Sequence, residues 1–217
     1  MNTRSATITA LGALAIAAVA VSQDSMEDWV MPEVKPAEHQ LAPAFDPASV
    51  NMDAWYEAST PGEEHKMLDQ LVGEWDVTQK LFVPGSPEPM TAKMTATSKW
   101  VLNGRHIQET IKGEMMGMPY EGMGVTSYDK YNGRYNFFWA DTMSTSSMLA
   151  TGFATADGGA IEAYGTLDEP SMGMRGKPYK MVVRAVDTDT HTFELHDLHI
   201  GGDNTMVMEL TYHRRKK

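Results

Sequence analysis

The sequence predicts an all-β domain, an up-and-down antiparallel barrel of about ten strands with a short helix plugging one end. From Gly73 onward, hydrophobic and polar side chains alternate along the chain, which is the period of a β-strand. Asn103-Gly104 and Asn132-Gly133 lie between such runs, and Asn-Gly is a strong hairpin signal. An even number of hairpin strands lets the first and last strands pair antiparallel, so the sheet can close without exposed edges.

The composition and charge exclude several classes of function. The chain has 217 residues, with 18 Lys and Arg against 29 Asp and Glu, a formal net charge of −11, and no cysteine. Without cysteine there is no disulfide scaffold, no thiolate zinc site and no cysteine nucleophile. The acidic balance argues against nucleic acid and anionic membrane surfaces as partners. The length suits one hydrophobic core, and a single barrel can use all of it.

Residues 1–22 are interpreted as a secretory signal peptide. Arg4 supplies a positive charge, residues 6–21 are uncharged and mostly apolar, and Ala20 and Ser22 are small residues at a cleavage site. The alternative, an uncleaved membrane anchor, is disfavoured because the stretch is rich in alanine and shorter than the ~20 apolar residues of a membrane span. We therefore expect a periplasmic or secreted protein with no membrane span after cleavage.

Residues 23–60 are predicted to form an acidic, proline-containing tether. Proline recurs along it and Lys35 is its one cation, and both features favour an extended chain. We expect one short helix in its second half, with Asp46 as the N-cap. Trp55 and Tyr56 are expected to dock that helix on the domain.

A better marked helix is predicted over residues 61–72, directly before the strands. Thr60 is the expected N-cap, with Pro61 at the first helical position and Glu63 as the acid of a capping box. Apolar residues then recur at helical spacing, and Gly73 ends the helix. A helix in this position is expected to plug one end of the barrel.

The barrel domain is predicted to span residues 61–217. The expected strands are residues 73–83, 90–102, 105–114, 120–130, 134–141, 145–155, 160–167, 178–187, 191–200 and 204–214. Two of the connections, 115–119 and 168–178, are long enough to carry function. Closure places Trp75 beside Arg214, within reach of a cation–π contact; the alternative is that Arg214 belongs to a solvated basic tail.

Several of these residues resemble those of known families. Gly73-Glu74-Trp75 resembles the Gly-x-Trp of the first strand in lipocalins and other calycins, and Arg214 resembles the late-strand arginine that packs on that tryptophan. A longer set is similar to a bacterial family of exported or cytosolic proteins known only as a domain of unknown function: residues 65–75, 100–105, 122–129, 139–141 and 212–214. The match covers residues 60 to 214. The resemblance implies a calycin-like, lipocalin-like barrel without an assigned activity, and it transfers no catalytic residue.

The alternation of the third strand predicts charged groups inside the barrel. Arg105 and Glu109 share a face with two isoleucines, so both are expected to be buried, and a buried ion needs a partner. Asp141 is a candidate partner. The functional interpretation is a ligand-binding site that orients the polar group of a small molecule, formed by Arg105, Glu109, Tyr128, Trp139 and Asp141. The alternative is a structural ion pair that fixes the barrel interior.

Histidine and methionine raise the question of a metal or a haem. No pair of the seven histidines has the strand spacing of a shared metal ion, so no metal site is predicted. One histidine, with His196 as the candidate, could ligate haem in a calycin-like barrel or simply be a solvated strand residue. Among the 18 methionines, those in 115–118 and 172–174 could bind Cu(I) or fill irregular space. The sequence identifies no cofactor.

The leading hypothesis for function is non-covalent binding of a small, largely apolar ligand inside the barrel, oriented by Arg105. A structural or assembly protein with a packed interior is the second class. An enzyme is third, because the chain has no Gly-x-Ser-x-Gly, no phosphate-binding glycine loop and no His-Glu-x-x-His. An outer-membrane barrel is disfavoured because its apolar face would turn Arg105 and Glu109 toward lipid. The oligomeric state is not predicted.

Overall fold

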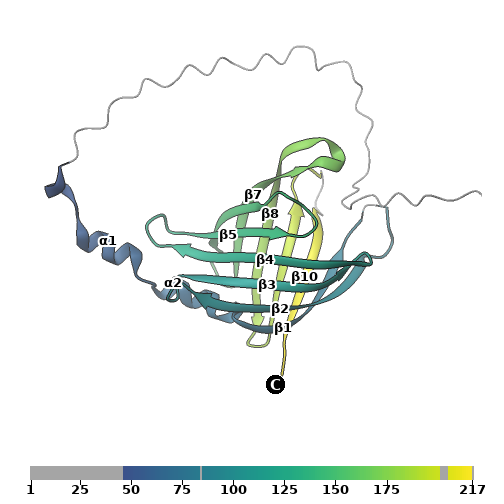
Figure 1. Ribbon diagram of the computed structural model, residues 1–217, viewed down its shortest axis with the longest axis horizontal. Coiled ribbons are helices and arrows are strands. Elements are labelled where there is room, and N and C mark those ends of the chain that lie inside the picture. The colour runs from purple at the N-terminus through teal and green to yellow at the C-terminus, as the bar shows by residue number, and fades with distance from the viewer. Residues whose placement is uncertain (1–45, 84, 201–204, 217) are drawn as a thin grey trace, which may run out of the picture.

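The computed structural model describes residues 46–83, 85–200 and 205–216 (Figure 1). The predicted signal peptide and residues 23–45 of the predicted tether lie outside the described residues. Among the described helices, none is long and apolar enough to cross a membrane.

Ten antiparallel strands form a closed barrel, which confirms the predicted fold class. Each strand pairs with its neighbours in sequence, and the first strand pairs with the last (Figure 1). The strands are β1 Gly73–Leu81, β2 Met90–Val101, β3 His106–Met115, β4 Met118–Asp129, β5 Arg134–Asp141, β6 Met148–Ala154, β7 Ala160–Glu169, β8 Met174–Asp187, β9 Thr190–Asp197 and β10 Met206–Arg214. Buried hydrophobic side chains from these strands and from the segment before β1 form two clusters that together make the core.

The seam between β1 and β10 contains the expected cation–π contact. Trp75 and Arg214 are register partners, and the guanidinium carbon lies 4.2 Å from the centre of the indole ring. Arg214 Nη1 also donates a hydrogen bond of 2.9 Å to the carbonyl of Val72. Gly73 leaves room for this arrangement, because a Cβ at that position would lie 2.3 Å from Nη1. The Gly-x-Trp pattern therefore has a steric reason: the arginine crosses the glycine to reach the tryptophan.

The segment before β1 is helical, but its helices differ from the predicted ones. In place of one helix over 61–72, a single α-turn, α2 Glu63–Lys66, continues into a 3-10 helix, η2 Met67–Leu71. The N-cap is Gly62 rather than Thr60, because the side chain of His65 turns back and accepts a hydrogen bond of 3.1 Å from the Gly62 N–H.

The earlier helix also starts later than expected. Asp46 caps only a 3-10 turn, η1 Pro47–Ser49, and Asn51 caps α1 Met52–Ser59. Trp55 and Tyr56 are each 58% exposed and contact each other edge to face, with 5.1 Å between ring centroids. The two rings therefore do not dock this helix on the barrel.

The α2–η2 segment closes one end of the barrel, as predicted (Figure 1). Leu68 is fully buried there. The Trp75 indole donates a hydrogen bond of 3.1 Å to the carbonyl of Leu71, and the Tyr135 hydroxyl donates one of 3.1 Å to the carbonyl of Glu64. We call this end of the barrel the plugged end. Its helices are held by apolar contact and by side chains that bond to their backbone.

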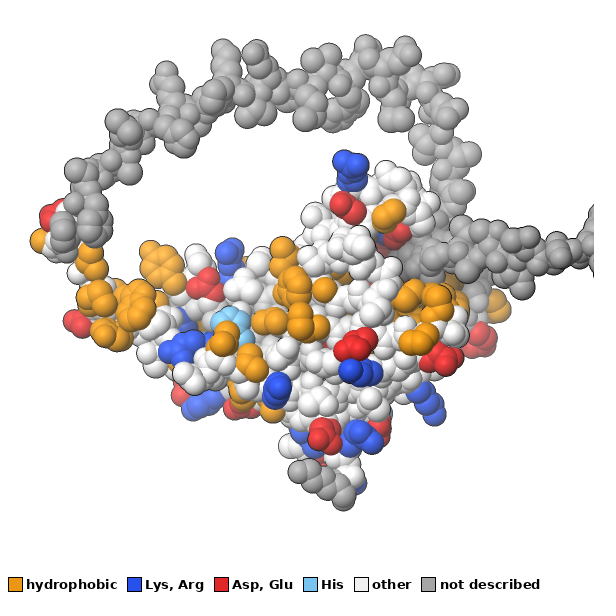
Figure 2. All heavy atoms as spheres, in the orientation of Figure 1, with side chains coloured by type: hydrophobic (Ala, Val, Ile, Leu, Met, Phe, Trp, Pro, Cys, Tyr) orange, Lys and Arg blue, Asp and Glu red, His pale blue; other side chains and the backbone are white. Residues whose placement is uncertain are grey.

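The outer wall carries both charge and hydrophobic surface. Figure 2 shows hydrophobic side chains over the wall that faces the viewer, with acidic and basic groups between and around them. Leu149 and Phe153 on β6 are each 63% exposed, and Tyr164 on β7 is 51% exposed. The exposed hydrophobic residues of the wall thus alternate with the inward-facing core residues of the same strands.

Candidate functional site

The barrel encloses a cavity of about 520 Å³. This volume lies within the ~300–1,000 Å³ of typical small-molecule sites. Its lining comes from the inward faces of the strands and is mainly apolar and aromatic. At the end opposite α2, the lining includes residues of three turns, 116–117, 142–147 and 170–173, and we call this end the mouth.

Glu109 on β3 places a carboxyl group in the lining of the cavity. Ser98 Oγ donates a hydrogen bond of 3.0 Å to one carboxyl oxygen, and the Tyr212 hydroxyl donates one of 3.2 Å to the other. Burial raises the pKa of Glu109, and the two hydroxyl donors only partly oppose that shift. Glu109 is therefore a buried carboxyl group in a mainly apolar lining, with one hydroxyl donor on each of its oxygens.

A second carboxyl group, Asp141 at the end of β5, organises the neighbouring wall. Its Oδ2 accepts a hydrogen bond of 2.9 Å from the Trp139 indole and one of 3.3 Å from the Tyr120 hydroxyl. The indole lies against two glycines of β4, because a Cβ on Gly122 would stand 2.3 Å from a Trp139 ring carbon and one on Gly124 would stand 3.1 Å away. The glycines of the Gly-Met-Gly run thus form a flat bed for the indole.

An aromatic stack lines the cavity near the seam. The His191 ring lies parallel to the Tyr212 ring, with 4.1 Å between centroids, and meets the Trp75 indole edge to face at 4.4 Å. Burial lowers the pKa of His191 to about 3, with the nearby Arg214 charge acting in the same direction. His191 is therefore neutral at physiological pH, and its buried Nδ1 has no hydrogen-bond partner.

Near the mouth, three buried charges form a group that we call the mouth triad. The Lys177 ammonium lies 3.1 Å from a carboxyl oxygen of Asp197 and 3.7 Å from one of Glu169. All three side chains are at most 9% exposed. The lysine therefore holds together the ends of β7, β8 and β9, where an unpaired buried charge would be costly.

The structure brings three of the five predicted ligand-binding residues to the cavity: Glu109, Trp139 and Asp141 all line it. Arg105 does not line it. Leu102, Asn103 and Gly104 take positive φ angles in a tight turn, so β3 starts one residue after Arg105.

The guanidinium of Arg105 instead faces the segment before β1. Its Nε donates a hydrogen bond of 3.0 Å to the carbonyl of Ser59. Tyr128 also lies away from the cavity lining, at the plugged end, with its ring centroid 4.8 Å from that of Tyr135 and 5.9 Å from that of His65.

Comparison with known proteins shows which family the chain belongs to. A family model described as "Protein of unknown function (DUF1579)" matches residues 60–214. The chain belongs to this family. Among solved structures, the crystal structure of Rv2717c from M. tuberculosis is 16% identical, with a TM-score of 0.49, over 72% of this chain and 100% of that chain. No curated protein matches the chain.

The DUF1579 match contains all ten strands, and with them several cavity residues that sequence reasoning missed. Tyr120, His191 and Tyr212 each line the cavity. The alternation of β9 contained a signal for His191, since it shares a face with Phe193 and Leu195.

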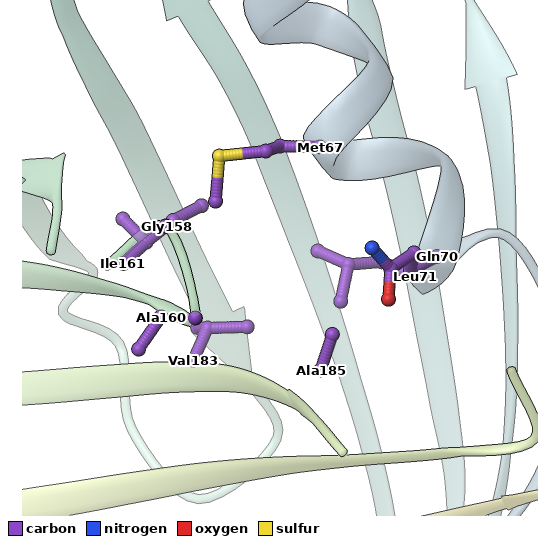
Figure 3. A pocket seen from close by; sticks show the side chains of 9 residues that line it. Met67, Gln70, Leu71, Gly158, Ala160, Ile161, Val183 and Ala185 are labelled. Carbon is purple, nitrogen blue, oxygen red and sulfur yellow. The ribbon is translucent and has the colours of Figure 1, made fainter. Parts of the chain in front are cut away.

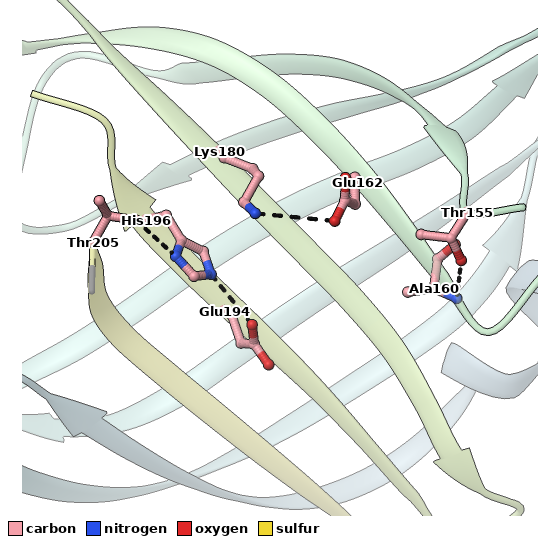
Figure 4. A network of polar contacts seen from close by, with 7 residues as sticks. All are labelled: Thr155, Ala160, Glu162, Lys180, Glu194, His196 and Thr205. Atoms are coloured by element: carbon pink, nitrogen blue, oxygen red, sulfur yellow. Dashed lines mark hydrogen bonds and ion pairs between the residues drawn. The ribbon is translucent and has the colours of Figure 1, made fainter. Parts of the chain in front are cut away.

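The structure gives no support to a metal site in the described part of the DUF1579 domain, where no three His, Cys, Asp or Glu residues lie close enough to hold an ion. His196, the candidate haem ligand, is not among the cavity residues. Its two ring nitrogens lie 3.1 Å from the Thr205 hydroxyl and 3.2 Å from a Glu194 oxygen. Figure 4 shows this contact beside the Lys180–Glu162 ion pair of the neighbouring strands.

A second hollow lies between the plug and the wall of the DUF1579 barrel. It measures about 30 Å³ and is lined by residues that include Met67, Leu71, Ala160 and Val183 (Figure 3). That space is enough for roughly one water molecule. It is therefore a packing gap between η2 and strands β7 and β8.

Proposed function

We propose that this protein binds a small, largely apolar molecule in the cavity of its barrel. The observation that carries the proposal is the cavity itself, about 520 Å³ with an apolar and aromatic lining. Two carboxyl groups with fixed hydrogen-bond donors interrupt that lining, and a few placed polar groups in an apolar pocket are typical of small-molecule sites. A hollow interior favours binding over the alternative of a purely structural barrel with a packed core.

A probe that is neutral and apolar tests the proposal directly. N-phenylnaphthylamine fluoresces more strongly in apolar surroundings, so its titration into the full chain is expected to give saturable enhancement. The variant Thr126→Phe places a large side chain among the cavity residues, and it is expected to weaken probe binding at least about tenfold. Thr151→Phe puts the same side chain at an exposed position of β6 and is the matched control.

The two variants are expected to differ in how strongly they enhance the fluorescence of the probe. Loss of the enhancement in Thr126→Phe alone supports binding in the cavity. Equal enhancement in the wild type and both variants would show that the probe binds elsewhere, and it would contradict the proposal. Native mass spectrometry of protein purified from its source then identifies any small molecule that remains bound.

We also propose that the protein is exported. The support is the pattern of residues 1–22, with Arg4 before an uncharged stretch and small residues before Gln23. The expected mature chain begins at Gln23. N-terminal sequencing of the native protein tests this: a chain that retains residues 1–22 in the cytoplasmic fraction would contradict export.

A further inference from the structure

The acidic and basic side chains that line the cavity are dominated by carboxyl groups. Four carboxyl groups contribute to its lining, those of Glu109, Asp141, Asp168 and Glu169. Among the described residues that line it there is no lysine and no arginine. The interior therefore offers acceptors and negative charge to a ligand, and it offers no cation to pair with an anionic head group.

Two positive groups lie beside residues of the lining or their ring partners, and both are already engaged. The Lys177 ammonium is enclosed by Asp197 and Glu169 in the mouth triad. The Arg214 guanidinium covers Trp75 and donates to the carbonyl of Val72. Neither cation is free to meet the polar end of a ligand without breaking contacts that hold the barrel together.

Of the four carboxyl groups in the lining, Glu109 lies within a strand, whereas the other three lie where β5 and β7 end at the mouth. Four titratable groups from other strands belong to the hydrogen-bond and ring contacts around Glu109: Tyr120 on β4, Asp141 on β5, His191 on β9 and Tyr212 on β10. His191 is neutral at physiological pH because burial lowers its pKa to about 3. Ser98 and Tyr212 each donate one hydrogen bond to Glu109, and a carboxylate has room for further donors.

We propose that the ligand is a lipophilic amine, whose ammonium group binds at Glu109 while its apolar part fills the cavity. This inference rests on the proposed function and names the ligand class for the same site. The chemistry is complementary, because an ammonium supplies donors and a positive charge, and the buried carboxylate supplies acceptors and the opposite charge.

The same arrangement disfavours fatty acids. A ligand carboxylate would bring a further negative charge into a low-dielectric space that already holds Glu109 and Asp141. With no cation in the described lining, that charge would be buried without a partner. A neutral alcohol of equal length would avoid the repulsion but would gain no ion pair, so it is expected to bind with intermediate affinity.

Three ligands that share one alkyl chain test the proposal: decylamine, decan-1-ol and decanoate. Each is used to displace N-phenylnaphthylamine from the full chain, with decylamine and decanoate below their micellar concentrations and decan-1-ol below its solubility limit. Decylamine is expected to bind at least about tenfold more tightly than decanol, and decanoate is expected to bind most weakly. If decanol or decanoate binds as tightly as decylamine, the amine inference fails while the proposed function stands. If neither the probe nor any of the three ligands binds, the proposed function itself fails.

A pair of variants on one strand locates the ammonium. Glu109→Gln keeps the shape and an acceptor for Ser98 or Tyr212 but removes the charge, and it is expected to weaken decylamine binding at least about tenfold with decanol unchanged. Glu114→Gln, at an exposed position of β3, is the control, and it is expected to leave the affinity for both ligands unchanged. If Glu109→Gln weakens the binding of decylamine and of decanol equally, or weakens the binding of neither, Glu109 is not the group that recognises the ammonium and the inference is overturned.

The pH dependence provides an independent readout. An alkylammonium, like a lysine ammonium, stays charged below about pH 10. Burial raises the pKa of free Glu109, so part of the binding free energy is used to remove its proton at low pH. Affinity for decylamine is therefore expected to rise with pH as Glu109 ionises, whereas affinity for decanol does not rise. A decylamine affinity that is flat with pH, or falls, would contradict the proposed ion pair.

Discussion

The two ends of the barrel are stabilised in different ways. At the plugged end, the fully buried Leu68 packs under α2 and η2, and aromatic side chains bond to the backbone of these helices. At the mouth, the Lys177 ammonium holds two buried carboxylates together. Apolar packing involves no titratable group, whereas a buried ion triad is stable only while its charges balance one another. Both ends therefore contribute to stability, the plugged end through apolar packing and the mouth through paired buried charges.

The largest effect is expected from breaking the mouth triad. Lys177→Met leaves the carboxylates of Glu169 and Asp197 buried without a cation, so the free energy of unfolding is expected to fall by about 3–5 kcal/mol at pH 7. Lys180→Met is the control, since its ion pair with Glu162 is long at 3.9 Å and partly exposed. Urea unfolding measures both variants.

The pH dependence of the Lys177→Met variant makes the comparison sharper. If the loss of stability comes from buried negative charge without a partner, it is expected to become smaller in acid, where carboxylates take up protons. A loss of stability that stays constant down to pH 5 would show that the lysine stem, and not its charge, holds the mouth.

A slightly smaller effect is expected at the plugged end. Leu68→Ala removes a fully buried side chain and is expected to lower the free energy of unfolding by about 2–5 kcal/mol, whatever the pH. Leu149→Ala, at a position that is 63% exposed on the outer wall, should change stability by less than about 0.5 kcal/mol. Urea unfolding at pH 7 and pH 5 would contradict the comparison if the loss in Leu68→Ala were strongly pH-dependent.

The smallest expected effect concerns His191, on the cavity wall near the seam. Burial lowers its folded-state pKa to about 3, below the ~6.5 of an unfolded histidine. Only the unfolded chain gains a proton as pH falls below ~6.5, so stability is lost progressively down to the folded-state pKa. At pH 5 this loss amounts to about 2 kcal/mol for one group.

Substitution at His191 isolates that contribution. His191→Phe keeps a flat ring against Tyr212 but cannot take up a proton, so its unfolding free energy should fall less between pH 7 and pH 5 than that of the wild type. His199→Gln, at an exposed position, should keep the wild-type pH dependence. Identical pH dependence in the wild type and His191→Phe would contradict a neutral, buried imidazole.

The barrel was predictable because its determinants are local. Period-two alternation and Asn-Gly turns specify strands and hairpins, and closure then pairs Trp75 with Arg214. The candidate site was harder, because which face a residue takes depends on where its strand starts. Arg105 lies one residue before the start of β3, so it belongs to the turn and does not line the cavity. Glu109 lies within β3 and does line it.

The structure also differs from the prediction in a segment that was expected to be a loop. Residues 168–178 were expected to form a loop, but β7 and β8 extend through most of them around a 3-10 turn, η3 Pro170–Met172. Lys177 is therefore a buried strand residue, on the same face of β8 as Tyr179 and Met181. The partner of a buried charge is harder to predict than its face, because Asp197 lies 20 positions away in the sequence, on another strand.

The pairing of β1 with β10 also has a consequence for how the chain folds. Lys80 meets Glu209 across this seam, and 129 positions separate the two residues in the sequence. Contacts between distant segments carry a large loop-closure entropy, and proteins rich in them fold slowly. While the ribosome is still synthesising residues 206–214, β1 has one edge without a neighbour, which is the condition under which strands aggregate. We therefore expect the barrel to complete its folding only after synthesis of the domain, in one late step that pairs β10 with β1.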